Sequence, residues 1–259
     1  MRSAIVTGSG GSGSGRAIAR RLAHAGLHVV VSDIDENGGR ETVRLIEDAG
    51  GRASFFRADM SSQHDVKSLI DFAGASAPLD ILVNNASSHV FDETPEAWKR
   101  QIEVDLLGGL YAMMHAIEAM KENGGGAIVN IASISALWHG RRTPGGIAAY
   151  DAAKAGLIRL TTGLRNLAST DGIRVNCLAP GWIATHGPLE YWQSLTPDER
   201  LARGVPSKLL QPDEIAAAVH KLATDKALAG RVVLWWSEDR PRLIADGDRG
   251  YHEFRDFEF

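Results

Sequence analysis

Cysteine, long apolar runs and basic clusters are all scarce in this chain of 259 residues. Cys177 is the single cysteine, so no intrachain disulfide can form and we expect a buried, inert thiol. No apolar run approaches the roughly 18 residues that span a bilayer, and the first residues lack the apolar core of a signal peptide. We therefore expect a cytoplasmic protein without membrane contact.

The charge and histidine patterns exclude two further classes of partner. The formal net charge is -4, and Lys and Arg form no cluster with interleaved aromatic residues, so nucleic acid is not expected as a partner. The nine histidines are scattered without the spacing of metal ligands, so we expect no catalytic metal.

Apolar, β-branched runs alternate with helical patterns along most of the chain, which predicts a doubly wound parallel seven-stranded sheet of the Rossmann type. The composition does not change before about residue 237, so we expect a single domain over residues 1–236. A substrate lid is expected at about residues 185–206, and residues 237–259 form a C-terminal tail. The predicted strands lie near residues 3–7, 28–32, 53–57, 80–84, 126–132, 173–178 and 231–236.

The first predicted strand runs directly into a glycine-rich turn, SGGSGSG, and then into a helix. Strand, glycine turn and helix together are typical of a loop that holds the pyrophosphate of a dinucleotide at the helix N-terminus. A flexible linker is the alternative, but a linker would not follow a buried strand so early in the chain. The candidate phosphate-binding residues are Gly8, Gly13, Ser14 and Gly15.

Asp33 ends the second predicted strand at the spacing expected of an acid that accepts the hydroxyls of the adenosine ribose. Its charge would repel the extra phosphate of NADP, so we expect NAD in preference to NADP. Arg16 and Arg40 favour the opposite preference if the loop places them beside a 2′-phosphate. Asp33 can also serve as a turn or N-cap residue, and the two roles are compatible.

Tyr150 and Lys154 are four residues apart in a helical pattern, which places their side chains on one helix face. A phenol with a pKa of about 10 is a poor acid or base at neutral pH, and a neighbouring ammonium makes it a better one. Such pairs also occur by chance, with the ring in the core and the lysine reaching solvent. The catalytic interpretation gains weight because Ser133 ends the buried strand that precedes this helix.

In these motifs the chain resembles the short-chain dehydrogenase/reductase family over about residues 3–236. The matching pieces are TGSGGSGSG, Asp33, the Ala58–Asp59 pair, NNA at residues 84–86, Ser133, YDAAK at residues 150–154 and PGWIAT at residues 180–185. The resemblance implies that Ser133 polarises the substrate oxygen, Tyr150 exchanges its proton, and Lys154 tunes Tyr150 and binds the nicotinamide ribose. It also implies cofactor contacts at Asp59, Met60, Asn85, Ala86 and Ile183.

Three features depart from the pattern of this family. The phosphate loop is one residue longer, so the assignment of individual glycines can shift by one. Ser87 replaces a usual glycine and is expected to narrow the nicotinamide pocket. Asp105 stands where the family has an asparagine that helps route a proton to the lysine. Its added negative charge is expected to raise the pKa of Tyr150 and Lys154, which predicts a higher pH optimum.

Substrate specificity is expected to come from two segments. Residues 134–149 separate Ser133 from Tyr150 by more positions than is usual in the family. Trp138, His139, Arg141 and Arg142 lie in this segment, and the arginines are interpreted either as a site for an anionic substrate or as solvated surface residues. Trp182, Tyr191 and Trp192 belong to the predicted lid or to ordinary packing. The tail, with Tyr251, is a candidate for docking on a neighbouring subunit.

These observations predict an NAD-dependent alcohol dehydrogenase or carbonyl reductase that transfers a hydride to or from a secondary alcohol or ketone. The alternatives are a nicotinamide-binding sensor or scaffold without turnover and, with less support, a nucleotide-sugar epimerase or dehydratase. The resemblance further implies a homodimer or homotetramer built on the helices around residues 106–120 and 150–167, with a small-molecule alcohol or carbonyl compound as substrate.

Overall fold

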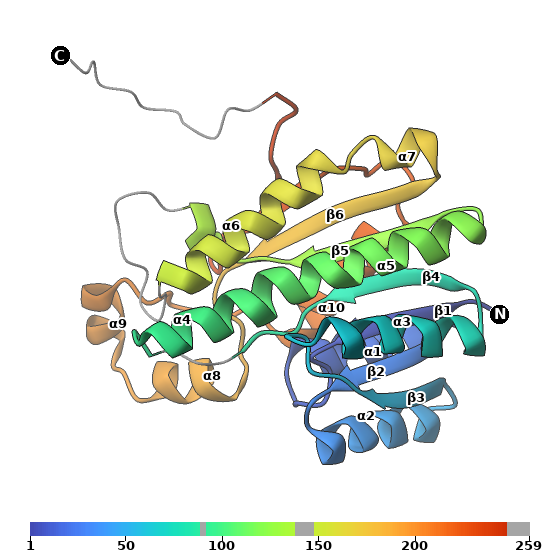
Figure 1. The fold of residues 1–259 in the computed structure, drawn as a ribbon. Helices are drawn as coiled ribbons and strands as arrows, with labels where there is room; N and C mark the ends of the chain where they lie inside the picture. Colours follow the sequence, from blue (N-terminus) through green and yellow to red (C-terminus); the bar gives the residue numbers. More distant parts are fainter. Residues whose placement is uncertain (89–91, 138–147, 248–259) are drawn as a thin grey trace.

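Eight strands form one sheet in the computed structural model, which describes residues 1–88, 92–137 and 148–247 (Figure 1). The order is β3-β2-β1-β4-β5-β6-β7-β8, and only β7 and β8 are antiparallel. The direction of winding reverses between β1 and β4, which is where open sheets of this type bind their ligands. The strands are β1 Ser3–Thr7, β2 His28–Asp33, β3 Arg52–Arg57, β4 Leu79–Asn84, β5 Gly126–Ile131, β6 Ile173–Pro180, β7 Val232–Trp235 and β8 Arg242–Leu243.

The mostly parallel sheet and the single-domain architecture confirm the predicted fold class. The predicted number of seven strands is wrong by one, because the short strand β8 pairs with β7 through Val233 and Leu234. The chain reverses just before it, where Asp239 N–H donates to Trp236 O. A strand of two residues has no alternation that a sequence pattern can reveal.

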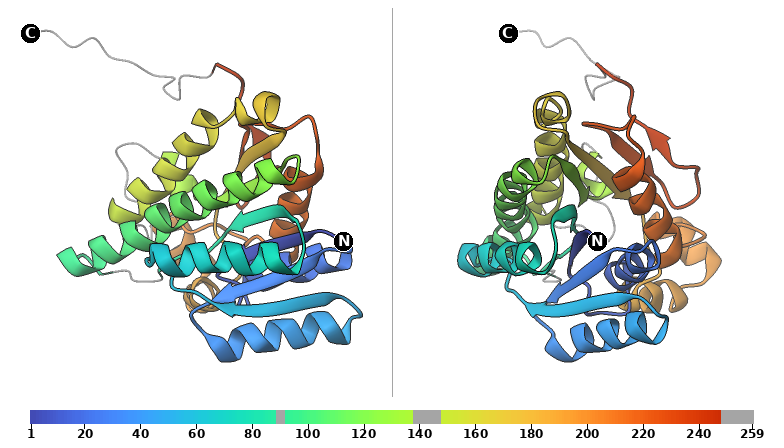
Figure 2. Two further views of the ribbon diagram at one scale, coloured as in Figure 1. Left: turned by 45° about the vertical axis from the view of Figure 1, so that its right-hand side comes forward. Right: turned by 90° about the vertical axis from the view of Figure 1, so that its right-hand side faces the viewer.

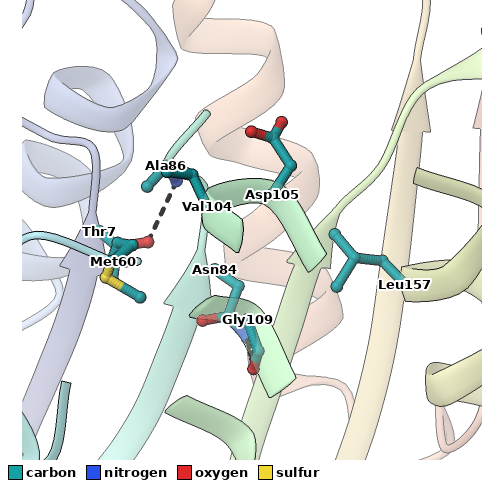
Figure 3. A pocket seen from close by; sticks show the side chains of 8 residues that line it. All are labelled: Thr7, Met60, Asn84, Ala86, Val104, Asp105, Gly109 and Leu157. Atoms are coloured by element: carbon teal, nitrogen blue, oxygen red, sulfur yellow. Dashed lines mark hydrogen bonds between the residues drawn. The ribbon is translucent and has the colours of Figure 1, made fainter. Parts of the chain in front are cut away.

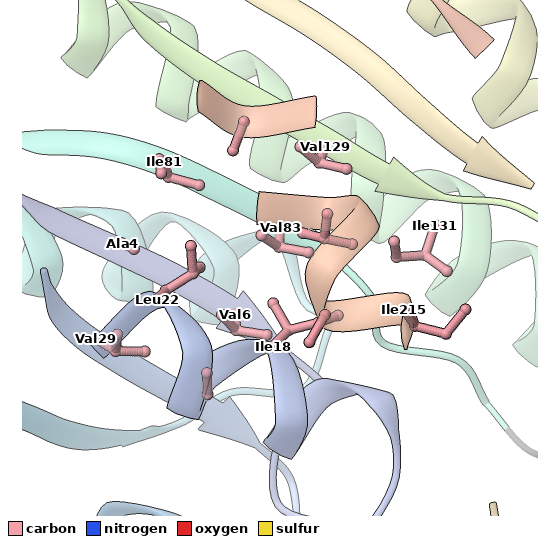
Figure 4. Close-up of a cluster of buried hydrophobic side chains, with 14 of the residues drawn as sticks. Ala4, Val6, Ile18, Leu22, Val29, Ile81, Val83, Val129, Ile131 and Ile215 are labelled. Atoms are coloured by element: carbon pink, nitrogen blue, oxygen red, sulfur yellow. The ribbon is translucent and has the colours of Figure 1, made fainter. Parts of the chain in front are cut away.

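Helices cover both faces of the sheet (Figures 1 and 2). Successive side chains of a strand point to opposite faces. Accordingly, Ala4 and Val6 pack in one core cluster and Ile5 in the other. The cluster with Ala4 and Val6 lies under α1, α2 and α10 (Figure 4), and the second lies under α3, α5 and α6. These helices are α1 Ser14–His24, α2 Glu36–Asp48, α3 Gln63–Ser76, α5 Gly109–Glu122, α6 Ala148–Gly163 and α10 Pro212–Thr224.

The long helix expected around residues 106–120 begins with a wide turn. A π-helical segment, η1 Glu103–Gly108, joins α4 Pro95–Ile102 to α5. Gly108 permits this path, because a Cβ atom there would lie 2.5 Å from the carbonyl oxygen of Met60. Wide turns of this kind are frequent at functional sites.

The remaining helices are short, and η2 Ile134–Leu137 directly follows Ser133. Beyond the carboxyl ends of the strands, α8 and α9 form an outer pair (Figure 1). Within the described ranges, no helix is both long and apolar enough to cross a bilayer. The other short helices are α7 Leu167–Thr170, α8 His186–Gln193 and α9 Pro197–Arg203.

Residues 240–247 dock on the edge of their own sheet. Ile244 N–H donates to Val232 O at 3.0 Å, and the Ile244 side chain packs against a cluster that includes Cys177. Asp246 forms ion pairs of 3.1 Å with both Arg165 and Arg231. The first part of the tail therefore closes the sheet edge, whereas Tyr251 lies outside the described residues.

We expect a chain truncated after Asp239 to unfold more easily than one truncated after Gly247. The shorter chain loses β8 and the packing of Ile244, which contributes about 1–2 kcal/mol for a partly buried side chain of this size. Urea denaturation followed by circular dichroism measures the difference. Equal midpoints for the two truncated chains would show that residues 240–247 add nothing to stability.

Candidate functional site

The glycine-rich turn forms a cradle at the start of α1. Gly8 has a φ of 65°, and a Cβ atom on Gly15 would lie 2.1 Å from the Gly8 carbonyl oxygen. A Cβ atom on Gly13, the N-cap of α1, would lie 2.9 Å from Cγ2 of Thr185. Only glycine fits these positions, and the free N–H groups at the helix N-terminus suit a phosphate. The cradle therefore fits the pyrophosphate of a dinucleotide.

The additional residue of this loop is accommodated at its outer edge. Gly11 and Ser12 are exposed, and a Cβ atom on Gly11 would meet nothing within 4 Å. Gly10, in contrast, packs against the Asp33 side chain. The loop therefore lengthens toward solvent and leaves the close approach of Gly8 and Gly15 intact.

Asp33 ties the end of β2 to this loop. Its carboxylate accepts hydrogen bonds from the N–H of Gly10 at 2.8 Å and of Asp35 at 3.0 Å, one on each oxygen. Each oxygen retains a lone pair for a ribose hydroxyl. The predicted turn role is therefore present and compatible with a cofactor role.

The two arginines that would favour NADP have other partners. Arg16 donates to Gly10 O at 2.6 Å, to Gly38 O at 3.3 Å and to Thr42 Oγ1 at 2.9 Å. Arg40 pairs with Glu36 on the exposed face of α2. The guanidinium of Arg16 is thus committed to holding the phosphate loop against α2.

Asn85 joins the loop after β4 to the phosphate loop. Its Nδ2 donates to the carbonyl oxygens of Thr7 and Gly8 at 3.0 and 2.9 Å, and its Oδ1 accepts from the Ser14 hydroxyl at 3.0 Å. The Thr7 hydroxyl oxygen accepts the N–H groups of Asn85 and Ala86. The structure therefore brings the predicted residues Gly8, Ser14, Asn85 and Ala86 together at the reversal between β1 and β4.

Asp59 and Met60 follow β3 and point in different directions. The Met60 side chain is buried in the core under α3 and α5, which leaves its backbone as the part that can contact a nucleotide. The Asp59 side chain is about one third exposed and pairs with Arg100. Burial opposes ionisation of Asp59, but bonds from Ser61 and Arg100 prevail and its pKa is lowered.

Tyr150 and Lys154 share one face of α6, as the spacing predicts. Lys154 Nζ lies 5.3 Å from the centre of the Tyr150 ring and donates to Ile131 O at 3.2 Å. It also lies 3.2 Å from Oδ2 of Asp105, and both side chains of this ion pair are almost fully buried. Burial is the largest single influence and lowers the pKa of Lys154, but the Asp105 carboxylate and the Tyr150 phenol together outweigh it and the pKa is raised. Lys154 is therefore held as a cation next to the phenol.

Asp105 lies in the π-helical segment η1, and both of its carboxylate oxygens accept hydrogen bonds. The Ser87 hydroxyl donates to Oδ2 at 2.6 Å, and the Ser88 N–H donates to Oδ1 at 2.9 Å. Ser87 therefore directs its hydroxyl at Asp105, and two of the three departures from the family pattern are in direct contact.

A cavity of about 10 Å³ lies behind this group, between the ends of β1 and β4 and the segment η1 (Figure 3). Asp105 and Asn84 line it together with Met60 and Leu157. The volume is about that of one water molecule. It is far too small for a nicotinamide or a substrate.

Ser133 is hydrogen-bonded to Ser135 in η2. Ser135 N–H donates to Ser133 Oγ at 3.2 Å, and the two hydroxyl oxygens lie 3.0 Å apart. The Ser135 hydroxyl is also bonded to the Asp151 carboxyl; burial raises the pKa of Asp151, and this bond opposes the rise. A serine hydroxyl has a single proton, so the fixed donor to Ser133 Oγ is the Ser135 N–H, which holds that oxygen in place.

The segment after β6 is fixed at both ends of Ile183. Ala184 N–H donates to Leu210 O and Leu210 N–H to Trp182 O, each at 2.8 Å. Trp182 N–H in turn donates to Ser237 Oγ at 2.8 Å. Ile183 is thereby held in one backbone position near the sheet edge.

The aromatic residues of the expected lid have different partners. Trp192 packs under Arg200 and donates to Pro206 O at 2.8 Å, so it joins α8 to α9. Trp182 and Tyr191 have ring centres 6.0 Å apart. No residue of α8 or α9 is buried. The residues Trp138, His139, Arg141 and Arg142 lie outside the described residues.

Sequence reasoning overlooked Thr7, Ser135 and Arg100. Ser133 and Ser135 are close in the sequence, but only the 3₁₀ turn η2 brings their hydroxyl groups within hydrogen-bond distance. Arg100 and Asp59 are distant in sequence and carry no shared motif.

We expect Asp105→Asn to lower the free energy of unfolding by about 3 kcal/mol, because it leaves Lys154 buried without its counter-charge. A raised pKa gives stability at lower pH that is lost as pH rises through it. Without the carboxylate, burial lowers the pKa of Lys154, so the stability deficit of the variant should shrink as pH rises and Lys154 gives up its charge. Urea denaturation from pH 7 to pH 10 measures both effects.

The double variant Asp105→Asn, Lys154→Met serves as the control for this prediction, since it removes the unpaired charge. We expect it to recover part of the stability and to lose the alkaline dependence. An Asp105→Asn protein as stable as the wild type at every pH would contradict this account of the ion pair.

Comparisons with known proteins agree with this geometry. Residues 2–193 match the profile of the short chain dehydrogenase family. The chain is 39% identical to cis-4-hydroxycyclohexanecarboxylate dehydrogenase from Sinomonas cyclohexanicum, over 87% of this chain and 90% of that protein. It is 34% identical to cyclohexanol dehydrogenase from Acinetobacter sp. (strain SE19), over 86% and 88% of the two chains.

Solved structures are similar over nearly the whole chain. A 7 alpha-hydroxysteroid dehydrogenase complexed with NADH and 7-oxo glycochenodeoxycholic acid has a TM-score of 0.78 and 30% identity, covering 91% of this chain and 92% of that one. A 3-oxoacyl (acyl-carrier-protein) reductase from Agrobacterium tumefaciens C58 with NADP bound has a TM-score of 0.79 and 29% identity, covering 91% and 93%. The chain therefore belongs to the short-chain dehydrogenase family of oxidoreductases.

Proposed function

We propose that this protein is an NAD-dependent dehydrogenase that interconverts a secondary alcohol and its ketone, with Tyr150 as the general acid and base. The observation that carries the proposal is the buried cation of Lys154, held beside the Tyr150 ring. A cation in that place stabilises a phenolate when the phenol gives up its proton. The relatives named as dehydrogenases of ring alcohols support a secondary alcohol as substrate.

The cofactor would lie along the edge formed by the carboxyl ends of the strands. Gly8, Gly13 and Gly15 would hold its pyrophosphate, Asp33 its adenosine ribose, and Lys154 its nicotinamide ribose. When bound, the nicotinamide supplies or accepts the hydride. Two of the three N–H groups of Lys154 face Ile131 O and Asp105, which leaves one for a ribose hydroxyl.

The preference for NAD rests on the charge at the end of β2. Asp33 presents a carboxylate where the ribose hydroxyls would bind, and a 2′-phosphate would be repelled there. Arg16 is occupied by the loop and by Thr42. Arg40, the other arginine that could favour NADP, pairs with Glu36.

Ser133 and Tyr150 would divide the work at the substrate oxygen. Ser135 holds the Ser133 oxygen in place, and the Ser133 hydroxyl would donate its proton to the substrate oxygen. The proton of an alcohol then has Tyr150 as its acceptor, and a ketone oxygen receives its proton from Tyr150. The protein thereby contributes positioning and proton transfer.

A nicotinamide-binding sensor without turnover is the second candidate. It is favoured by the direct ion pair of Lys154 with Asp105. A lysine whose charge is balanced by a carboxylate stabilises a neighbouring phenolate less. The two candidates differ in whether reduced cofactor accumulates with an alcohol.

A homo-oligomer and a cytoplasmic location remain part of this proposal. Trp98 on α4 and Met114 on α5 are exposed large hydrophobic side chains, which is consistent with association through this side of the molecule. Either a homodimer or a homotetramer is compatible with these exposed side chains.

The proposed function is tested with the purified protein, NAD or NADP, and a panel of ring alcohols, by the absorbance of reduced nicotinamide. We expect turnover with NAD, and a fall of about 100-fold or more in Tyr150→Phe, because the ring remains and the acid–base group is lost. Cofactor binding, measured by calorimetry, should be unchanged in this variant. Tight NAD binding by the wild type without turnover on the whole panel would favour the sensor.

We expect Ser135→Ala to lower kcat by about fivefold without raising KM, because it removes the hydroxyl that lies 3.0 Å from Ser133 Oγ and lets the Ser133 hydroxyl turn away from the substrate oxygen. Ser135→Thr keeps a hydroxyl and should restore kcat. Steady-state kinetics with each variant measures the two constants. A rise in KM with kcat unchanged would indicate instead that Ser135 only shapes the pocket.

A further inference from the structure

Asp151 directly follows Tyr150 in the first turn of α6, and its side chain faces η2. The carboxyl group of Asp151, which is half-buried, is bonded to the Ser135 hydroxyl. The Ser135 hydroxyl oxygen in turn lies 3.0 Å from Ser133 Oγ. A carboxyl group is therefore connected, through two hydroxyl groups, to the place where the substrate oxygen would bind.

The surroundings of Asp151 do not suit a negative charge. Its Oδ1 is buried and has no hydrogen-bond partner in the described part of the chain, whereas a buried ionised carboxylate needs donors on both oxygens. Burial raises the pKa of Asp151, and the bond with Ser135 only opposes this rise. The carboxyl group therefore keeps its proton to higher pH than an ordinary aspartic acid.

The elements packed against α6 bring no counter-charge to Asp151 among the residues described. These elements are α4, η1, η2, β5, β6 and β7, of which η2, β5 and β7 carry no charged residue. Three nearby cations have carboxylate partners: Lys99 pairs with Glu103, Arg100 with Asp59, and Lys154 with Asp105. The other titratable residues of these elements and of α6 are Glu96, Tyr150, Arg159, Arg174 and Cys177, and none of them shifts the pKa of Asp151.

The protonation state of Asp151 sets the direction of the hydrogen bonds in this chain of groups, because each serine hydroxyl has a single proton. An ionised carboxylate only accepts, so it takes the Ser135 proton and leaves the Ser135 oxygen as a competing acceptor for the Ser133 proton. A protonated carboxyl group donates to the Ser135 oxygen, and the Ser135 proton then points to Ser133 Oγ. In that state the Ser133 proton is free for the substrate oxygen.

We propose that Asp151 is a positioning residue that acts through Ser135, and that in its protonated form it directs the Ser133 proton toward the substrate oxygen. The proposal rests on the proposed function, because it requires a substrate oxygen beside Ser133. Between an alcohol and its ketone this oxygen carries partial negative charge, which a directed hydroxyl donor stabilises. Both directions of the reaction should therefore be faster while Asp151 holds its proton.

The test follows kcat for the reduction of a cyclic ketone by NADH from pH 4.5 to pH 9.5. We expect two falls in the wild type as pH rises. The first, of about fivefold, occurs as Asp151 loses its proton and the directed bond from Ser133 is weakened. The second occurs as Tyr150 loses its proton.

Two variants separate the first fall from the second. Asp151→Asn should keep the higher rate until the fall at Tyr150, because its amide N–H donates to Ser135 at every pH while its oxygen takes the place of the unpartnered Oδ1. Ser135→Ala should show the lower rate without a first fall, because the connection to Asp151 is broken. The double variant should match Ser135→Ala, since residues that act through one another are not additive.

Asp213→Asn is the matched control. Asp213 is an exposed aspartate in the first turn of α10, which covers the opposite face of the sheet from α6. This variant removes the same charge near a helix N-terminus, where an acidic residue is favourable. It should keep both falls, which separates the proposed role of Asp151 from a general effect of charge.

Infrared spectroscopy detects the proton on Asp151 without a substrate. We expect the difference between wild type and Asp151→Asn to contain the C=O band of a protonated carboxyl group, which disappears as pH rises through the first fall. A protein that shows this band but turns over no alcohol or ketone would support the bond from Asp151 to Ser135 and count against the dehydrogenase.

Three results would overturn the proposal. The first is a single fall in the pH profile of the wild type. The second is a first fall that persists in Asp151→Asn or disappears in Asp213→Asn. The third is the absence of the carboxyl band from the difference spectrum, whatever the turnover.

Discussion

The buried ion pair of Lys154 and Asp105 is the interaction on which the site depends. Two charges removed from water are costly unless each finds close partners, and here Lys154 has Asp105 and Ile131 O while Asp105 also receives Ser87 and Ser88. The pair holds α6 against η1. Lys154, which lies 5.3 Å from the centre of the Tyr150 ring, is thereby fixed beside the phenol.

The ion pair also explains why two departures from the family pattern occur together. An asparagine at position 105 brings its own donors and no charge, whereas Asp105 needs donors on both oxygens. The Ser87 hydroxyl supplies one of them at 2.6 Å. In this chain Ser87, the residue after the Asn-Ala pair, therefore serves the carboxylate, and the expectation that it narrows the nicotinamide pocket stays a prediction.

Side-chain hydrogen bonds to the backbone join the other parts of the edge. Three side chains are hydrogen-bonded to the backbone of the phosphate loop: Asp33 at the end of β2, Arg16 on α1 and Asn85 after β4. Each bond spans two elements that meet only in the folded chain. As a result, the candidate cofactor residues sit on strand ends that the core holds in place on both faces of the sheet.

Local patterns in the sequence by themselves determined the parallel sheet and most of its strand positions, because alternation, glycine turns and helical spacing act over a few residues. They also indicated the Tyr150–Lys154 pair and the phosphate loop. Only the tertiary structure decided the direct contact of Asp105 with Lys154 and Ser87, the support of Ser133 by Ser135, the contact of Arg100 with Asp59, and the added strand β8. These depend on which segments the packed core brings within hydrogen-bond distance, and no local pattern encodes that choice.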